Sequence, residues 1–322
     1  MKKKIKVGLV GAGGMARRHL EVMSAVQGLE PVGITSRTMS KAEKIASEFN
    51  IPFCVKSMSE LVERANPDAL MILVSEDQMF NVSREAIDFK LPLFIEKPAG
   101  LSPEENFELM VKAEQNSIPN MVGFNRRYYS VFHQGLKVIK QHGRLLGVLI
   151  EGHERMWKIR ESGNFSDLLM NNWLFANSVH TIDLLRFFGG EVKDLKVISH
   201  RAFNEKHGDQ FAAICELESG AIGEYIAHWY SPGGWRIVLY GEKITVEFKP
   251  LEKGFITNEK FEIQEIVPDE KDQRFRAGFF GELEAFARLA RGEGKDGFMQ
   301  NLEGSHKTML LAQKLSEKVR NV

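Results

Sequence analysis

Two segments of the chain carry side chains that are suited to proton transfer. In the first, Glu96-Lys97-Pro98 directly follows the apolar residues Leu93–Ile95. If those residues form a parallel strand, Lys97 lies at the carboxyl end of that strand, where open α/β sheets bind their ligands. An oxidised nicotinamide nearby is positively charged and would lower the pKa of Lys97, which favours proton transfer by this side chain. The structural alternative is a solvated lysine.

The second segment is Asn177–Asp183, in which His180 and Asp183 stand three residues apart and would share one face of a helix. Asn177 and Ser178 are typical N-cap residues, so His180 would lie at the start of that helix. The helix dipole would then depress the pKa of His180 and keep the imidazole neutral, ready to donate or accept a proton at a substrate oxygen. Asp183 would orient His180 or stabilise the helix start. The alternative is a structural histidine.

A glycine-rich loop at the start of the chain predicts dinucleotide binding. Gly11-x-Gly13-x-x-Ala16 fits the G-x-G-x-x-G/A pattern and stands between an apolar strand, Ile5–Val10, and a helix that runs over about Met15–Val26. Gly11 would allow the tight turn, Gly13 the approach of a pyrophosphate, and Ala16 the close packing of helix on sheet. The alternative is a glycine-rich turn that binds nothing.

The second predicted strand, Glu30–Thr35, is followed by Ser36-Arg37-Thr38, at the place that contacts the adenosine ribose. An Asp or Glu there would bind the ribose 2′-hydroxyl of NAD, and this chain has neither. Ser36 and Arg37 could instead hold a 2′-phosphate, and one such charge-assisted hydrogen bond contributes about 1.5–3 kcal/mol. We therefore favour NADP over NAD. The alternative is that Arg37 only ends the strand in solvent.

Strand and helix patterns alternate up to about Gly123, which predicts an α/β fold with a doubly wound, parallel Rossmann sheet. Beyond it we expect an α+β domain with an open, mostly antiparallel sheet, so the predicted domains are residues 1–123 and 124–322. Helix starts are predicted at Ser40 and Ser102-Pro103, hairpins at Glu218–Gly220 and Pro232–Gly234, and an irregular segment up to Phe175.

Composition limits the classes of partner. The 322 residues include 43 basic and 43 acidic ones, so nothing indicates binding to nucleic acid or to an anionic membrane. Cys54 and Cys215 are far apart and fit buried thiols in a reducing compartment, and no Cys/His spacing suggests a metal site. The apolar run after Lys2–Lys4 breaks into glycines, unlike a signal peptide. We therefore expect a cytoplasmic protein without a membrane span.

Taken together, these segments resemble the Gfo/Idh/MocA family, which includes glucose–fructose oxidoreductase and inositol dehydrogenase. The resemblance covers nearly the whole chain and rests on the glycine loop, the Glu-Lys-Pro tripeptide, residues 123–128 (GFNRRY) and the His-x-x-Asp segment. It implies NAD(P)-linked oxidation or reduction of a secondary hydroxyl of a sugar or polyol. It also implies that Lys97 contacts cofactor and substrate, that His180 is the catalytic histidine, and that Arg126 is a basic residue at the domain junction.

The chain departs from the family pattern at three places. Ala176 stands where relatives commonly carry Asp, four residues before the histidine, and Met170–Trp173 lacks the usual glycine-rich run. Ser75–Gln78 replaces a frequent Thr-Pro-x-His. Without the usual Asp, the lysine and histidine would transfer the proton alone, or Asn177 would position the substrate.

The expected function is an NADP-preferring oxidoreductase that transfers hydride to or from a sugar or polyol. Two alternatives are a catalytically silent nucleotide-binding sensor or regulator, and a lyase or glycosidase that uses NAD transiently. We expect a homo-oligomer, a dimer or tetramer, formed through the C-terminal sheet. The expected cofactor contacts are Gly11, Ala12, Gly13, Gly14, Met15, Ser36, Arg37, Ser75, Glu96, Lys97 and Arg126, and the expected substrate contacts are Lys97, Asn125, Trp173, Asn177, His180 and Asp183.

Overall fold

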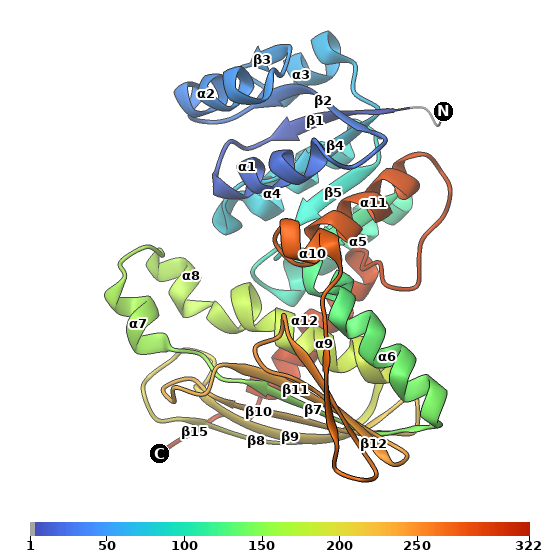
Figure 1. Cartoon of the computed structure of the whole chain (residues 1–322). Coiled ribbons are helices and arrows are strands. Elements are labelled where there is room, and N and C mark those ends of the chain that lie inside the picture. Colours follow the sequence, from blue (N-terminus) through green and yellow to red (C-terminus); the bar gives the residue numbers. More distant parts are fainter. Residues whose placement is uncertain (1–3) are drawn as a thin grey trace. The chain divides into compact units, whose positions relative to one another are not determined.

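The computed structural model describes residues 4–322, which form two compact units (Figure 1). The first unit runs to Asn125 and also takes in Gly278–His306; the second comprises Arg126–Ala277 and Lys307–Val322. The predicted domain boundary at residue 123/124 stays a prediction. The first unit is formed by two separate segments of the chain. No described helix has the length and apolar character needed to cross a membrane.

The first unit is built on a six-stranded parallel sheet, which confirms the predicted Rossmann fold. The strand order is β3-β2-β1-β4-β5-β6, so the winding reverses between β1 and β4, at the kind of switch point where dinucleotides bind. The strands are β1 (Ile5–Val10), β2 (Leu29–Thr35), β3 (Phe53–Val55), β4 (Ala69–Ile72), β5 (Leu93–Glu96) and β6 (Asn120–Gly123), and the helices are α1 (Gly14–Met23), α2 (Met39–Phe49), α3 (Met58–Ala65), α4 (Glu76–Ile87), α5 (Pro103–Gln115) and α11 (Phe279–Ala290).

Local sequence explains most element ends in this unit. All four residues of β4 are buried, as expected for an apolar run covered on both faces. The Oγ of Ser102 accepts a hydrogen bond from the N–H of Glu105 and Pro103 opens α5, which confirms the predicted helix start. The cap predicted at Ser40 is wrong. Helix α2 begins earlier, at Met39, because the turn after β2 closes at once through a hydrogen bond from the Thr38 N–H to the Ser36 Oγ.

The second unit contains a nine-stranded sheet, mostly antiparallel as predicted, in the order β14-β13-β12-β11-β7-β10-β9-β8-β15. The hairpin predicted at Glu218–Gly220 joins β9 to β10 and is confirmed, whereas the one at Pro232–Gly234 is wrong, because β7 lies between β10 and β11 and pairs in parallel with β10. The strands are β7 (Leu145–Gly152), β8 (Val192–Arg201), β9 (Gln210–Leu217), β10 (Ile222–His228), β11 (Trp235–Gly241), β12 (Ile244–Phe248), β13 (Gly254–Asn258), β14 (Ile263–Ile266) and β15 (Arg320–Asn321).

Helices cover one face of this sheet, as Figure 1 shows for α6 and α9. Along β9 the buried residues Phe211, Ala213, Cys215 and Leu217 alternate with exposed ones on the opposite face, the period expected of a half-covered strand. The helical segments of this part of the chain are η1 (Asn125–Tyr128), α6 (Ser130–His142), α7 (Met156–Glu161), α8 (Asp167–Asn171), η2 (Leu174–Ser178), α9 (Val179–Gly189), α10 (Glu270–Arg274) and α12 (Leu302–Ser316).

The irregular segment predicted up to Phe175 is wrong, because α7, α8 and the π-helical turn η2 occupy it. This turn leads directly into α9, and Ser178 already has helical backbone angles (φ −68°, ψ −14°). Asn177 and Ser178 therefore do not cap the helix with their side chains, contrary to the prediction. The prediction that His180 lies beside a free helix start is therefore also wrong, because the turn η2 continues the helix backwards from α9.

Candidate active site

A groove of about 420 Å³ follows the carboxyl ends of β1, β2 and β4 in the first unit. Its position is the one at which open α/β sheets bind nucleotides. Of the residues predicted to contact the cofactor, six line this groove: Gly11, Ala12, Gly13, Ser36, Arg37 and Ser75.

The glycine loop has the geometry that a pyrophosphate requires. Gly11 has φ +116°, and a Cβ built on it would lie 2.3 Å from the carbonyl oxygen of Leu73, so only glycine fits. A Cβ on Gly13 or Gly14 would meet nothing within 4 Å, which leaves the loop surface open. Helix α1 begins at Gly14 without a side-chain cap, so its first N–H groups can bind an anion. Buried Ala16 lets this helix pack closely.

The opposite end of the groove is basic. Exposed Arg37 and half-buried Ser36 follow β2, and Lys41 and Lys56 also line this groove. Hydrogen bonds from Ser75 and Gln78, together with the charge of Arg37, lower the pKa of Asp77. Three basic side chains therefore line this end of the groove.

Glu96 does not line the groove. Its Oε1 is 2.7 Å from Nε2 of buried His19 on α1, and its Oε2 accepts a hydrogen bond of 3.0 Å from the N–H of Lys97. Burial and the charge of Glu96 raise the pKa of Glu282, on α11, well above its ordinary value. Glu96 thus fixes the backbone before half-buried Lys97, and its predicted contact with the cofactor stays a prediction.

A second cavity, of about 560 Å³, lies wholly within the second unit. Arg126 and Asn177, two predicted site residues, line it, and so does Trp235. The guanidinium of Arg126 lies 4.4 Å from the centre of a Trp235 ring, and the buried imidazole of His180 lies 6.1 Å from Trp235, ring centre to ring centre. Trp235 therefore connects His180 with the cavity.

Glu154 is a candidate site residue that was not predicted from the sequence. It lines the cavity, is 5% exposed, and accepts hydrogen bonds of 3.1 Å from the Asn177 Nδ2 and the Ser178 Oγ. Burial raises its pKa from 4.5 to about 7, although the hydrogen bonds from Ser178 and Asn177 and the charge of Arg126 oppose the rise. The signal was a charged cluster, His153-Glu154-Arg155, directly after a strand.

Replacing Glu154 with glutamine should change how stability depends on pH. Because the carboxyl has a higher pKa in the folded chain than its ordinary 4.5, the fold binds its proton more tightly, and wild-type stability falls as the pH rises from 4.5 to about 7. At about 1.4 kcal/mol per pKa unit, the fall is about 3 kcal/mol. We expect the Glu154→Gln variant not to show this fall in stability. Urea unfolding of both proteins at several pH values measures the difference. Parallel pH profiles would contradict the assignment.

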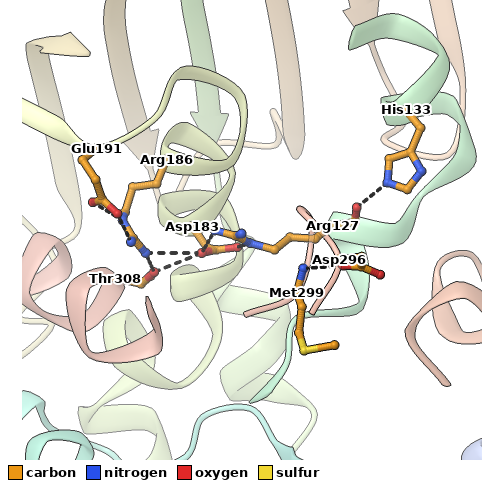
Figure 2. Close-up of polar contacts among 8 residues, drawn as sticks. All are labelled: Arg127, His133, Asp183, Arg186, Glu191, Asp296, Met299 and Thr308. Atoms are coloured by element: carbon orange, nitrogen blue, oxygen red, sulfur yellow. Dashed lines mark hydrogen bonds and ion pairs between the residues drawn. The ribbon is translucent and has the colours of Figure 1, made fainter. Parts of the chain in front are cut away.

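Asp183 belongs to a buried ion-pair cluster (Figure 2). Its carboxylate accepts hydrogen bonds of 2.6 and 2.8 Å from the Nε and Nη2 of Arg127, and one of 3.0 Å from the Thr308 Oγ1. That hydroxyl accepts a 2.6 Å hydrogen bond from Arg186, which also pairs with Glu191. Asp183 does not line the cavity. The cluster gives it a role in the packing of α9, and its predicted contact with the substrate stays a prediction.

Trp173 and Asn125, two predicted substrate contacts, are buried and lie outside the two linings. Trp173 is 6% exposed and packs edge-on against Phe165, which itself lines the cavity of the second unit. Asn125 is 7% exposed, in the turn η1. Within residues 4–322, no three His, Cys, Asp or Glu side chains are grouped as metal ligands would be.

Comparison with known proteins agrees with both halves of this description. Residues 5–124 match the domain described as "Oxidoreductase family, NAD-binding Rossmann fold", and residues 150–247 match the "GFO/IDH/MocA C-terminal domain". The chain belongs to the Gfo/Idh/MocA family of oxidoreductases. The resemblance inferred from the glycine loop, the Glu-Lys-Pro tripeptide and the His-x-x-Asp segment is therefore confirmed.

Individual Gfo/Idh/MocA relatives are distant. The scyllo-inositol 2-dehydrogenase (NAD(+)) of Bacillus subtilis is 24% identical over 95% of this chain and 91% of that protein. The oxidoreductase YrbE of the same organism is 25% identical over 69% of this chain but only 64% of its own length, less than two thirds. The dehydrogenase of Chromobacterium violaceum has the same fold, with a TM-score of 0.82, 20% identity, and coverage of 98% of this chain and 95% of that one.

Proposed function

We propose that this Gfo/Idh/MocA protein transfers hydride between a nicotinamide nucleotide and a secondary hydroxyl or carbonyl of a sugar or polyol. The observation that carries the proposal is the groove of the first unit, where an open glycine loop meets the start of α1 at the switch point of the sheet. The named activity of the B. subtilis inositol dehydrogenase supports a polyol as the type of substrate.

Different residues would bind the cofactor, transfer the proton and orient the substrate in such a reaction. The bound nicotinamide would supply the hydride acceptor or donor. N–H groups at the start of α1 hold the pyrophosphate. Lys97 in the first unit and His180 in the second are the side chains proposed to transfer the proton. In the cavity of the second unit, Arg126 and Asn177 orient the substrate.

Glu154 takes over part of the role that Ala176 leaves open. Ala176 is 3% exposed and has no acidic group. The Glu154 carboxyl, however, accepts hydrogen bonds from Asn177 and Ser178, the two residues that follow Ala176. Near neutral pH this carboxyl can both hold and release a proton, because its pKa is about 7. This arrangement favours an active enzyme over a silent nucleotide sensor.

The cofactor is proposed to be NADP rather than NAD, because Arg37 and Ser36 line the groove where a 2′-phosphate would lie.

Replacing Arg37 with alanine should remove one charge-assisted hydrogen bond and weaken NADP binding roughly 10- to 150-fold, with little effect on NAD. Calorimetric titration of both proteins with both nucleotides measures this. Equal affinity of the wild-type chain for NADP and NAD would contradict the proposed preference.

The proposed activity is tested by screening sugars and polyols with the preferred nucleotide and following the absorbance of the reduced nicotinamide. An oxidoreductase changes this absorbance in proportion to the substrate consumed. Tight nucleotide binding with no absorbance change over a wide panel would favour the sensor. Substrate consumption without any net absorbance change would favour a lyase or glycosidase that uses NAD transiently.

The open face of the nine-stranded sheet supports the expected homo-oligomer. Large apolar side chains are exposed there on four strands, and solvent disfavours so much apolar surface in one region. Measurement of the molar mass in solution tests the proposal, and a monomer at all concentrations would contradict it. The exposed side chains are Ile198, Ile214, Ile222 and Tyr240.

The predicted cytoplasmic location stays a prediction.

A further inference from the structure

The cavity of the second unit carries unpaired positive charge. Arg126, Arg155 and Lys158 line it, and among residues 4–322 none of their side chains makes a hydrogen bond or an ion pair. Other arginines of the same unit are paired with carboxylates: Arg127 with Asp183, Arg160 with Glu205, Arg186 with Glu191, and Arg236 with Glu151 and Glu247. The cavity therefore brings together three cations that the described part of the chain leaves without a counter-charge.

The lining offers little negative charge to balance them. Its one carboxyl is Glu154, which is buried and holds its proton up to about neutral pH. The remaining titratable side chain, His153, has its pKa lowered, chiefly by burial, and so adds no charge at neutral pH. At pH 7 the cavity is thus net positive, which a neutral polyol does not require.

Arg155 and Lys158 stand three residues apart, at the start of α7, so their side chains emerge on neighbouring positions of one turn. Both are exposed, whereas Arg126 is partly buried against Trp235, where burial lowers its pKa. A planar guanidinium can bind two oxygens of one anion at once, and an ammonium adds a point charge beside it. Together they form a receptor for a group with several anionic oxygens.

We propose that the substrate of this site is a sugar or polyol derivative that carries a phosphate or carboxylate group, which Arg155 and Lys158 bind. The inference rests on the proposed function for the reaction at the substrate hydroxyl. The ring of the substrate would lie against Trp235, and Ser162, Asn164 and Asn177 offer hydrogen bonds to its hydroxyls. The cavity volume of about 560 Å³ suits a ligand of this size.

The test is calorimetric titration of the full chain, saturated with its nicotinamide nucleotide, with matched probes. The probes are glucose, glucose 6-phosphate and glucuronate, and myo-inositol with its monophosphate. We expect the better anionic probe to bind at least tenfold more tightly than its neutral parent, and the double variant Arg155→Ala/Lys158→Ala to lose roughly 10- to 100-fold in affinity for it. The phosphate and carboxylate arms identify which anion the site takes.

The matched control is Arg144→Ala/Lys243→Ala, which removes the same two residue types from exposed positions of the second unit outside the cavity. This control should bind the anionic probe like the wild type. Three results would overturn the inference: neutral parents that bind as tightly as the anions, no binding of any anionic probe, or an unchanged affinity in the cavity variant.

The absorbance of the nicotinamide, read in the same samples, separates this inference from the proposed function. Charge-dependent binding without any redox turnover supports the anion site and contradicts the proposed reaction. Turnover of a neutral sugar at the same rate in the wild type and the cavity variant contradicts the anion site and leaves the proposed reaction standing.

Discussion

Replacing Lys97 with alanine is expected to slow turnover by about 10²- to 10⁴-fold while nucleotide affinity stays within about tenfold, because general acid–base help is worth that much to the chemical step. Lys97 follows β5 directly, and the carboxylate of Glu96, itself 2.7 Å from His19, accepts a hydrogen bond from its N–H. The amine is therefore carried by a rigid strand end. Steady-state kinetics and calorimetry on the two proteins measure turnover and affinity separately.

Two further variants make this result specific. Lys97→Arg keeps the positive charge but cannot release a proton near neutral pH, so it should be nearly as slow as the alanine variant. Lys44→Ala removes an exposed lysine from α2 and should leave turnover unchanged. Unchanged turnover in Lys97→Ala, or full activity in Lys97→Arg, would contradict proton transfer by this residue.

Replacing Asp183 with alanine is expected to lower the free energy of unfolding by about 3–5 kcal/mol, the range found when one partner of a buried ion pair is removed. Asp183 is 1% exposed, and its loss leaves buried Arg127 without the two hydrogen bonds of 2.6 and 2.8 Å. The Thr308 hydroxyl loses its acceptor as well. Urea unfolding measured at neutral pH gives the difference.

Glu191 supplies the matched control in the same cluster. Its carboxylate also pairs with an arginine, Arg186, but its side chain is 49% exposed, so Glu191→Ala should cost about 1 kcal/mol or less. The double variant Asp183→Leu/Arg127→Met removes both charges of this buried pair and should be more stable than Asp183→Ala. Equal losses in the Asp183 and Glu191 single variants would contradict the role of burial.

Most of the fold was predictable because its elements have strong local patterns. The buried run that forms β4, the strand, glycine loop and helix at Gly11–Ala16, and the serine cap of α5 each depend on neighbouring residues alone. The order of strands in the second sheet was not predictable in the same way. Strand β7 inserts between β10 and β11 from about 70 residues earlier in the chain, a pairing that no turn signal at Pro232–Gly234 could indicate.

Site residues that belong to a sequence motif were predictable. Site residues whose properties depend on burial in the folded chain were not. The glycine loop and Arg37 were found from spacing, and they line the groove. Glu154 was missed because its character comes from being 5% exposed beside Asn177 and Ser178, and a sequence does not display burial. The ion pair of Asp183 was not predicted for the related reason that its partner, Arg127, lies 56 residues away.

The most direct test of the proposed function follows the transferred hydrogen itself. A sugar or polyol that changes the nicotinamide absorbance is labelled with deuterium at its carbinol carbon, and the nucleotide is examined by mass spectrometry after one turnover. We expect the reduced nicotinamide to carry the deuterium and the product to be the corresponding carbonyl compound. Consumption of the labelled substrate with the nicotinamide left unlabelled and unchanged in redox state would contradict it.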